Sequence, residues 1–77
     1  MKMEYDIEAD AIYISITDAP YAYGKDLDNE RRIDYDKNGK PRGIELLCVS
    51  AGVLLDDLPN SEEVARLLGT KRIKVFA

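Results

Sequence analysis

The chain of 77 residues contains no histidine and only one cysteine, Cys48. Without histidine it lacks the commonest general base, the commonest transition-metal ligand and the partner of most Ser or Cys nucleophiles. A single cysteine also excludes an intrachain disulfide and any zinc site built from several cysteines. Cys48 lies among Leu46, Leu47 and Val49, which predicts a buried structural thiol rather than a nucleophile. We therefore expect no enzyme, and no cofactor.

Long apolar runs are also absent, so no segment predicts a membrane span. The first residues, M-K-M-E-Y-D, carry carboxylates where a signal peptide has its apolar core, which favours a cytoplasmic protein without a membrane partner. The length predicts a single domain over residues 1–77, whose small core gives marginal stability. Assembly into a homo-oligomer, most simply a dimer, would compensate for this.

Basic residues are scarce in the first half of the chain. Residues 1–36 hold ten Asp or Glu and four Lys or Arg, whereas residues 37–77 hold five and seven. Nucleic-acid binding needs a basic face, and the cluster of Lys71, Arg72 and Lys74 is too small to supply one, so we expect no nucleic-acid partner. The acidic half predicts instead a basic protein as partner.

Alternation of apolar and polar residues predicts four strands, at Lys2–Tyr5, Ala11–Thr17, Leu27–Tyr35 and Gly43–Val49. The last is apolar at consecutive positions, which indicates a central strand or a bulge near Leu46. Residues 18–25 include Pro20 and Gly24 and are predicted to form a linker without regular structure.

The C-terminal part predicts one helix, beginning near Asn60 or Ser61 and ending at Gly69. Val64, Leu67 and Leu68 would form its packing face. A short final strand is expected within residues 71–76, at an edge of the sheet. The fold class is therefore α+β, with a four-stranded antiparallel β-meander over residues 1–50 packed on the helix, and the loop, helix and last strand over residues 51–77.

Residues 34–45, D-Y-D-K-N-G-K-P-R-G-I-E, match the pattern of an EF-hand calcium loop. Asp34, Asp36, Asn38 and Glu45 would be the metal ligands. However, an EF-hand requires flanking helices, and both flanks here have strand patterns. The pair Asn38-Gly39 favours a tight hairpin turn, because both residues tolerate positive φ. We therefore predict a hairpin and no metal.

Two further groups of residues remain as candidates. The first is the acidic turn, with Asp6, Glu8 and Asp10, and the second is the set of tyrosines Tyr13, Tyr21 and Tyr23. The acidic residues could cap a turn, because Asp side chains bond nearby backbone, and could attract a basic partner. The tyrosines are expected at the sheet surface and in an interface.

The segments Y-D-x-E-A-D-A-x-Y-I at Tyr5–Ile14 and I-D-Y-D-x-x-G-x-x-x-G-I-E at Ile33–Glu45 together resemble a small prokaryotic family, domain of unknown function 2283. Members often have proline at the position of Ile7. The resemblance implies a compact sheet-based fold, no established catalytic residues and an association with gene pairs of the toxin-antitoxin type.

These observations predict a small non-catalytic module for protein interaction or oligomerisation, of the kind that an antitoxin-like partner of a basic protein would have. The alternative is a divalent-metal site or a metal-dependent hydrolase. Its ligands would be the acidic turn residues, namely Asp6, Glu8, Asp10, Asp34, Asp36 and Glu45.

Overall fold

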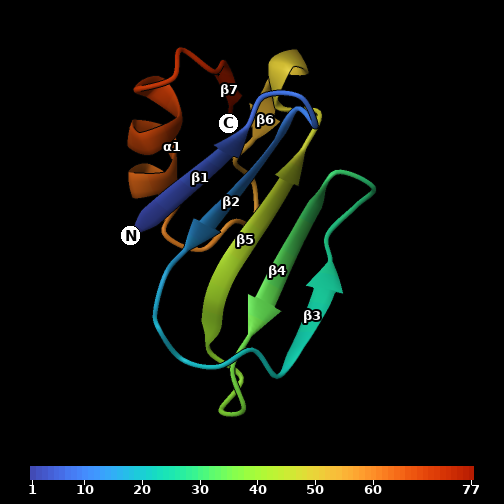
Figure 1. Cartoon of the computed structure of the whole chain (residues 1–77), viewed down its shortest axis with the longest axis vertical. Coiled ribbons are helices and arrows are strands. Elements are labelled where there is room, and N and C mark those ends of the chain that lie inside the picture. Colours follow the sequence, from blue (N-terminus) through green and yellow to red (C-terminus); the bar gives the residue numbers. More distant parts are fainter.

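Five antiparallel strands form the main sheet of the computed structural model, which describes all residues, 1–77 (Figure 1). The strands are β1 (Lys2–Asp6), β2 (Ala11–Ser15), β3 (Tyr23–Asp26), β4 (Arg31–Tyr35) and β5 (Pro41–Leu47). The fold class α+β is thus confirmed. No helix in the structure has the length and apolar character that crossing a membrane requires.

The predicted meander is wrong, because the strand order is β1-β2-β5-β4-β3. Residues 16–22 carry the chain past the ends of β5 and β4, so that β3 forms the far edge (Figure 1). β5 then pairs with both β2 and β4. Its apolar composition, with Ile44 and Leu46 fully buried, explains the central position that was predicted for it.

The predicted third strand, Leu27–Tyr35, is confirmed over Arg31–Tyr35 as β4, but its first part is wrong, because a turn precedes β4. The Asp28 carboxylate closes this turn: its Oδ1 accepts hydrogen bonds from the backbone N–H groups of Glu30 and Arg31, both at 2.9 Å. The strand on the other side, β3, occupies residues that were predicted to be a linker. The bulge near Leu46, which was predicted as the alternative to a central strand, is absent, and the shift in register lies at Asp34/Tyr35 of β4.

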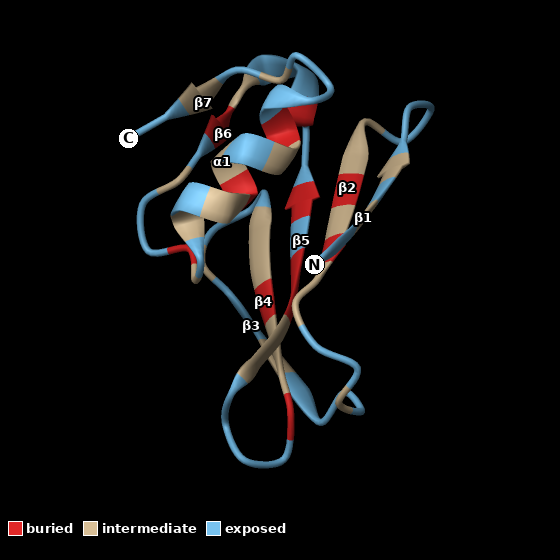
Figure 2. Ribbon diagram, turned by 90° about the vertical axis from the view of Figure 1, so that its left-hand side faces the viewer, coloured by how far each residue is buried: buried red, intermediate tan, exposed pale blue.

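Helix α1 (Ser61–Gly69) covers one face of the main sheet, which we call the inner face (Figure 2). The predicted start, end and packing face of the helix are confirmed: Val64 and Leu68 are fully buried and Leu67 packs against the core. They meet Ile12, Ile14 and other alternate residues of β2 and β5. Burying side chains of this size stabilises the fold by about 1.5–3 kcal/mol each.

The segment between the main sheet and α1 consists of a 3₁₀ turn, Val49–Ala51, and the short strand β6 (Val53–Leu54). The predicted C-terminal strand exists as β7 (Val75–Phe76), but it pairs in parallel with β6 in a separate two-stranded sheet. The expectation that it extends the main sheet is wrong. Val49 and Val53 are buried under the inner face and complete the core.

Candidate functional site

The face of the sheet opposite α1, which we call the outer face, carries no second layer (Figure 2). The strand register places five side chains in one row across it. In strand order these are Glu4, Tyr13, Glu45, Arg32 and Asp26. The row is therefore polar throughout, and it includes the predicted interaction residue Tyr13.

Tyr13 lies at the centre of a hydrogen-bond network on the outer face. Its hydroxyl donates to Asp34 Oδ2 at 2.8 Å and accepts from Arg42 Nη1 at 2.8 Å, while Arg42 Nε donates to the carbonyl of Ala19 at 2.8 Å. The phenol ring lies directly over Gly43, where a Cβ atom would collide with it. The network therefore joins β2, β4 and β5 to the 16–22 connection.

Burial, and then the hydrogen bond to Asp34, raise the pKa of Tyr13. Both effects favour the neutral phenol, because burial penalises a charged group and the carboxylate would repel a phenolate. Tyr13 is thus held as a neutral structural residue at physiological pH, and it is a poor candidate for a general base.

Arg32 neutralises the β3–β4 half of the outer face. Its guanidinium lies over Gly24 and contacts Asp26 Oδ1 at 2.9 Å and Asp34 Oδ1 at 3.4 Å. Nη2 also donates to the Tyr21 hydroxyl at 3.3 Å. Hydrogen bonding to Tyr21 and then to Asp26 raises the pKa of Arg32, so it stays charged.

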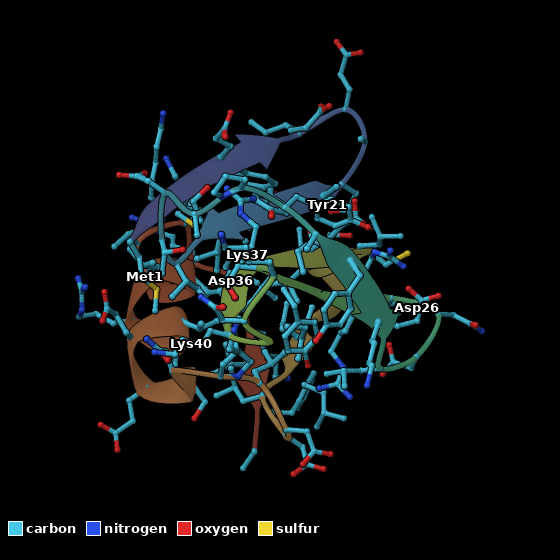
Figure 3. The ribbon with its side chains drawn as sticks, turned by 90° about the horizontal axis from the view of Figure 1, so that it is seen from below. Met1, Tyr21, Asp26, Asp36, Lys37 and Lys40 are labelled. Carbon is cyan, nitrogen blue, oxygen red and sulfur yellow. The ribbon has the colours of Figure 1, made fainter.

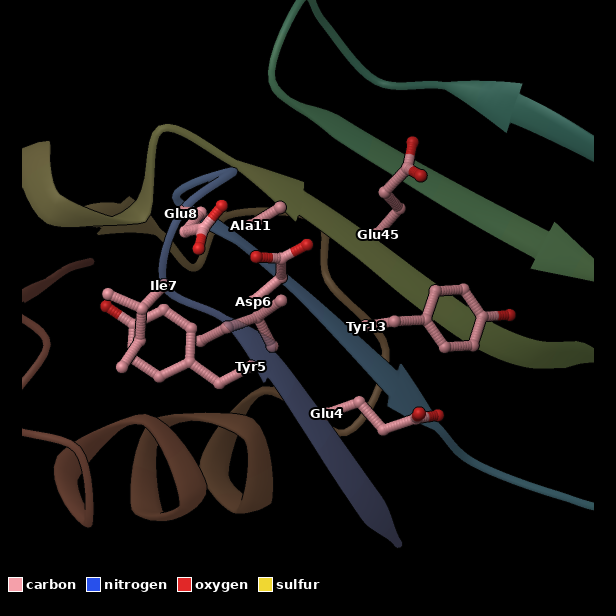
Figure 4. A pocket seen from close by; sticks show the side chains of 9 residues that line it. Glu4, Tyr5, Asp6, Ile7, Glu8, Ala11, Tyr13 and Glu45 are labelled. Carbon is pink, nitrogen blue, oxygen red and sulfur yellow. The ribbon is translucent and has the colours of Figure 1, made fainter.

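The β1–β2 half of the outer face is an open groove of a different character (Figure 4). Four carboxylates line it, and the ion pairs of the structure involve none of them. They are Glu4, Asp6, Glu8 and Glu45. Ile7 lies at the rim with 77% of its surface exposed. We call this region, with its four carboxylates, the acidic groove.

The turn between β1 and β2 uses two of its three predicted carboxylates to hold the backbone. Asp6 Oδ1 accepts from the N–H of Ala9 at 3.1 Å. Asp10, with φ of 55°, accepts from the backbone N–H of Ser50 at 2.9 Å and from its hydroxyl at 2.6 Å. Asp10 thus ties the turn to the segment after β5, whereas Glu8 remains in the acidic groove.

The predicted hairpin at residues 36–40 is confirmed as a turn between β4 and β5, seen end-on in Figure 3. Asp36 Oδ1 accepts from the N–H groups of Asn38 at 2.8 Å and Lys40 at 3.0 Å. Gly39 alone of the Asn-Gly pair has positive φ, at 76°. The turn is therefore the three-residue type that ends in a left-handed glycine, not the two-residue type that was predicted.

This arrangement leaves the EF-hand ligands apart. The Asp36 carboxylate is nearly buried and serves the turn, Asp34 binds Tyr13 and Arg32, and Glu45 belongs to the acidic groove. No group of three or more Asp, Glu, His or Cys side chains is placed to hold a metal ion. The residues of the alternative metal site, including Asp6, Glu8 and Asp10, therefore do not converge.

Cys48 is exposed, so the prediction of a buried thiol is wrong. The chain leaves the sheet at this residue with φ of 54°, a left-handed conformation that turns the side chain away from the core. Hydrogen bonding to Glu30, and then the charge of that carboxylate, raise the pKa of the thiol. A protonated thiol is a weak nucleophile, so the position does not suit covalent chemistry.

The tyrosines Tyr21 and Tyr23 lie at the β3 edge of the sheet. Tyr23 stacks on Tyr35 of β4, with ring centroids 5.1 Å apart and planes at 17°. Tyr21, labelled in Figure 3, is 53% exposed. Both rings are partly exposed to solvent, which agrees with the predicted position at the surface of the sheet.

Sequence reasoning missed Arg32 and Arg42 as members of the outer-face network. Arg32 follows strand alternation, but its link to Tyr13 through Asp34 needs the β4–β5–β2 register. Arg42 directly precedes Gly43, and the Tyr13 ring can reach Arg42 because Gly43 has no Cβ atom that would collide with the ring. Neither relation is visible in a single sequence.

The fold and this surface define a small α+β domain whose sheet has one uncovered, charged face. The chain belongs to a family described as protein of unknown function (DUF2283), whose model matches residues 2–50. The matched segment contains all five strands of the main sheet and the whole outer face. No curated protein and no solved structure matches the chain.

Proposed function

We propose that the protein is a non-catalytic interaction module that binds a basic protein through the acidic groove. The observation that carries this proposal is the group of four unpaired carboxylates on an uncovered sheet face. Carboxylates without an ion-pair partner on one surface give that surface a negative potential, which attracts a cationic partner. The exposed Ile7 beside them supplies an apolar contact, as specific interfaces require.

The remaining chemistry of the chain supports binding over catalysis. Histidine is absent. Burial and then the hydrogen bond to Asp34 raise the pKa of Tyr13, and the hydrogen bond to Glu30 raises the pKa of Cys48, so both groups favour the protonated form. A role as an antitoxin-like partner is consistent with this proposal, because such a partner acts by occupying another protein's surface.

We also propose that two copies of the chain associate, through a surface other than the acidic groove. The β3 edge carries the exposed Tyr21 and Tyr23 and is remote from the acidic groove in the strand order. A dimer formed there would leave the groove open to a partner.

The proposal is tested with a matched pair of variants. The groove variant replaces the four groove carboxylates by amides: Glu4→Gln, Asp6→Asn, Glu8→Gln and Glu45→Gln. The control variant makes four changes of the same kind outside the groove: Asp56→Asn, Asp57→Asn, Glu62→Gln and Glu63→Gln. A basic protein that co-purifies from host lysate is identified, purified and titrated against each. We expect the groove variant alone to lose at least about tenfold in affinity. Equal affinities, or an acidic partner, would overturn the proposal.

A further inference from the structure

Strand β1 is an edge of the main sheet and pairs with β2 along its whole length, Lys2–Asp6, without a bulge. In an antiparallel pair the backbone groups of alternate residues point away from the partner. On β1 these N–H and C=O groups have no strand to bond, since β1 is the end member of the order β1-β2-β5-β4-β3. The strand contains no proline that would prevent further pairing.

The two faces of β1 differ in chemistry. Met3 and Tyr5 are half-buried and pack against the core on the inner face. Glu4 and Asp6 are exposed and line the acidic groove on the outer face (Figure 4). A strand added beside β1 would place alternate side chains next to each of these two environments.

The opposite edge strand, β3, differs from β1 in its length, in the pairing of its outer-face carboxylate and in the character of its inner-face residues. It has four residues, its outer-face carboxylate Asp26 is already paired with Arg32, and its inner-face residue Lys25 is cationic. An added basic strand would find no free carboxylate there.

Charge selects the occupant of the β1 edge. Pairing two copies through β1 would bring two acidic grooves together, which adds like charges at close range. A strand with cations on its outer face would neutralise Glu4 and Asp6 instead. Cross-strand pairs of opposite charge contribute about 0.2–1 kcal/mol each, in addition to the backbone hydrogen bonds.

We propose that β1 binds an extended basic segment of the partner as a sixth strand, with Lys or Arg at every second position beside Glu4 and Asp6 and apolar residues between them beside Met3 and Tyr5. This recognition mode draws affinity from main-chain hydrogen bonds and specificity from alternate side chains. The inference rests on the proposed function and names how the partner is recognised.

The test uses two synthetic peptides of the same composition, one in which lysine and valine alternate and one in which all lysines precede all valines. Binding to the full chain is followed by fluorescence anisotropy, and the backbone amides of β1 are followed by NMR and hydrogen exchange. We expect the alternating peptide to bind at least about tenfold more tightly. Binding should slow exchange at the β1 amides that point to the free edge. Two further peptides carry N-methyl groups on every second backbone nitrogen, one on the odd and one on the even positions. The peptide whose methyl groups block the N–H groups that face β1 should lose both the tight binding and the protection of the β1 amides, and the other peptide should keep them.

Two protein variants separate the inference from the proposed function. Glu4→Lys/Asp6→Lys should weaken the alternating peptide at least about tenfold, while Asp56→Lys/Glu62→Lys, with the same change in charge, should leave it within about twofold. Equal binding of both peptides at the groove, without protection of β1, would overturn strand addition and leave the proposed function standing. Absence of any groove-dependent binding would overturn both.

Discussion

At the scale of single residues, the outer face depends on two glycines that admit long side chains. The Tyr13 ring occupies the space over Gly43, and the Arg32 guanidinium occupies the space over Gly24. Each glycine thereby allows a polar side chain to lie flat on the sheet and reach a partner on another strand. The absence of a side chain at these positions is a packing requirement.

The substitution Gly43→Ala should destabilise the fold by about 1–3 kcal/mol, because the added Cβ must displace the Tyr13 ring and disturb its bonds to Asp34 and Arg42. Gly69→Ala is the matched control: nothing lies within 4 Å of its added Cβ, and alanine favours helix by up to about 1 kcal/mol. Urea denaturation measures both. A Gly43→Ala protein as stable as wild type would show that the ring is not fixed there.

The raised pKa of Tyr13 predicts a pH dependence of stability. The folded state holds the phenol proton more tightly than the unfolded chain, so this contribution is fully present below the ordinary pKa of 10.0. It is lost as the pH rises through the higher pKa of the folded state. Tyr13→Phe should therefore reduce the loss of stability on going from about pH 9 to about pH 11, measured by urea denaturation. An identical alkaline slope in wild type and variant would contradict this.

At the scale of elements, Asp residues define three of the turns. Asp6 accepts a hydrogen bond from one backbone N–H, whereas Asp28 and Asp36 each accept from two, all within four residues ahead in the chain. The hairpin at residues 36–40 was predicted correctly from the pair Asn38-Gly39, although the role of the Asp36 carboxylate in it was not. The turn at Asp28 was missed because apolar Leu27 and Ile33 share a parity that suggested one continuous strand.

Asp36→Ala should cost about 1–3 kcal/mol in the free energy of unfolding, because the N–H groups of Asn38 and Lys40 lose their shared acceptor, Oδ1, at a nearly buried site. Asp36→Asn keeps the Oδ1 acceptor and should recover most of that loss. Thermal or urea denaturation of the three proteins gives the comparison. If the Asn protein were as unstable as the Ala protein, the negative charge rather than the hydrogen bonds would hold the turn.

Because Asp36 bonds the backbone of its own turn, we expect calcium to have no effect on the melting temperature of the protein. Binding to the folded state alone must raise the melting temperature as the ligand concentration exceeds its Kd. Since the carboxylates of Asp34, Asp36 and Glu45 do not converge, millimolar calcium or magnesium should leave the melting temperature unchanged once ionic strength is matched. A metal-dependent increase that Asp36→Asn removes would restore the metal-site interpretation.

At the scale of the whole molecule, local patterns predicted most elements but not their order. Alternation identified β1, β2 and β5, and capping residues identified α1. The placement of β5 between β2 and β4 depends on which apolar strand is buried most deeply, and this is a property of the assembled core. The short polar strand β3 has no apolar pattern, because it lies at an edge and contacts little of the core.

The acidic groove was anticipated only in part. Asp6 and Glu8 were expected from their spacing, but Glu45 joins them only because β5 lies beside β2, where Glu45 is paired with Tyr13. Arg32 and Arg42 entered the outer-face network for the same reason. Residues distant in sequence could not be assigned to one surface before the strand order was known.

The free β3 edge and its tyrosines predict a dimer. Light scattering should give twice the chain mass of 8.7 kDa at high protein concentration, and Tyr21→Ser should shift the monomer–dimer equilibrium toward monomer. Ile7→Ser, at the acidic groove, is the control that should leave the mass unchanged. A monomer at all concentrations, or a dimer broken by Ile7→Ser, would contradict this assignment.

The central position of β5 has a consequence for how the chain folds during synthesis. The β1–β2 hairpin and the β3–β4 pair can form as soon as they emerge from the ribosome, yet nothing joins them until β5 has been made. Until Leu47 has been added, β2 and β4 each expose an unpaired edge, and Ile12, Ile14 and Ile33 lack the apolar neighbours that later bury them. Edges of this kind are where misassembly begins. Substitutions that weaken β5, such as Ile44→Thr, should therefore reduce the yield of soluble protein during expression by more than they reduce the stability of the molecules that do fold.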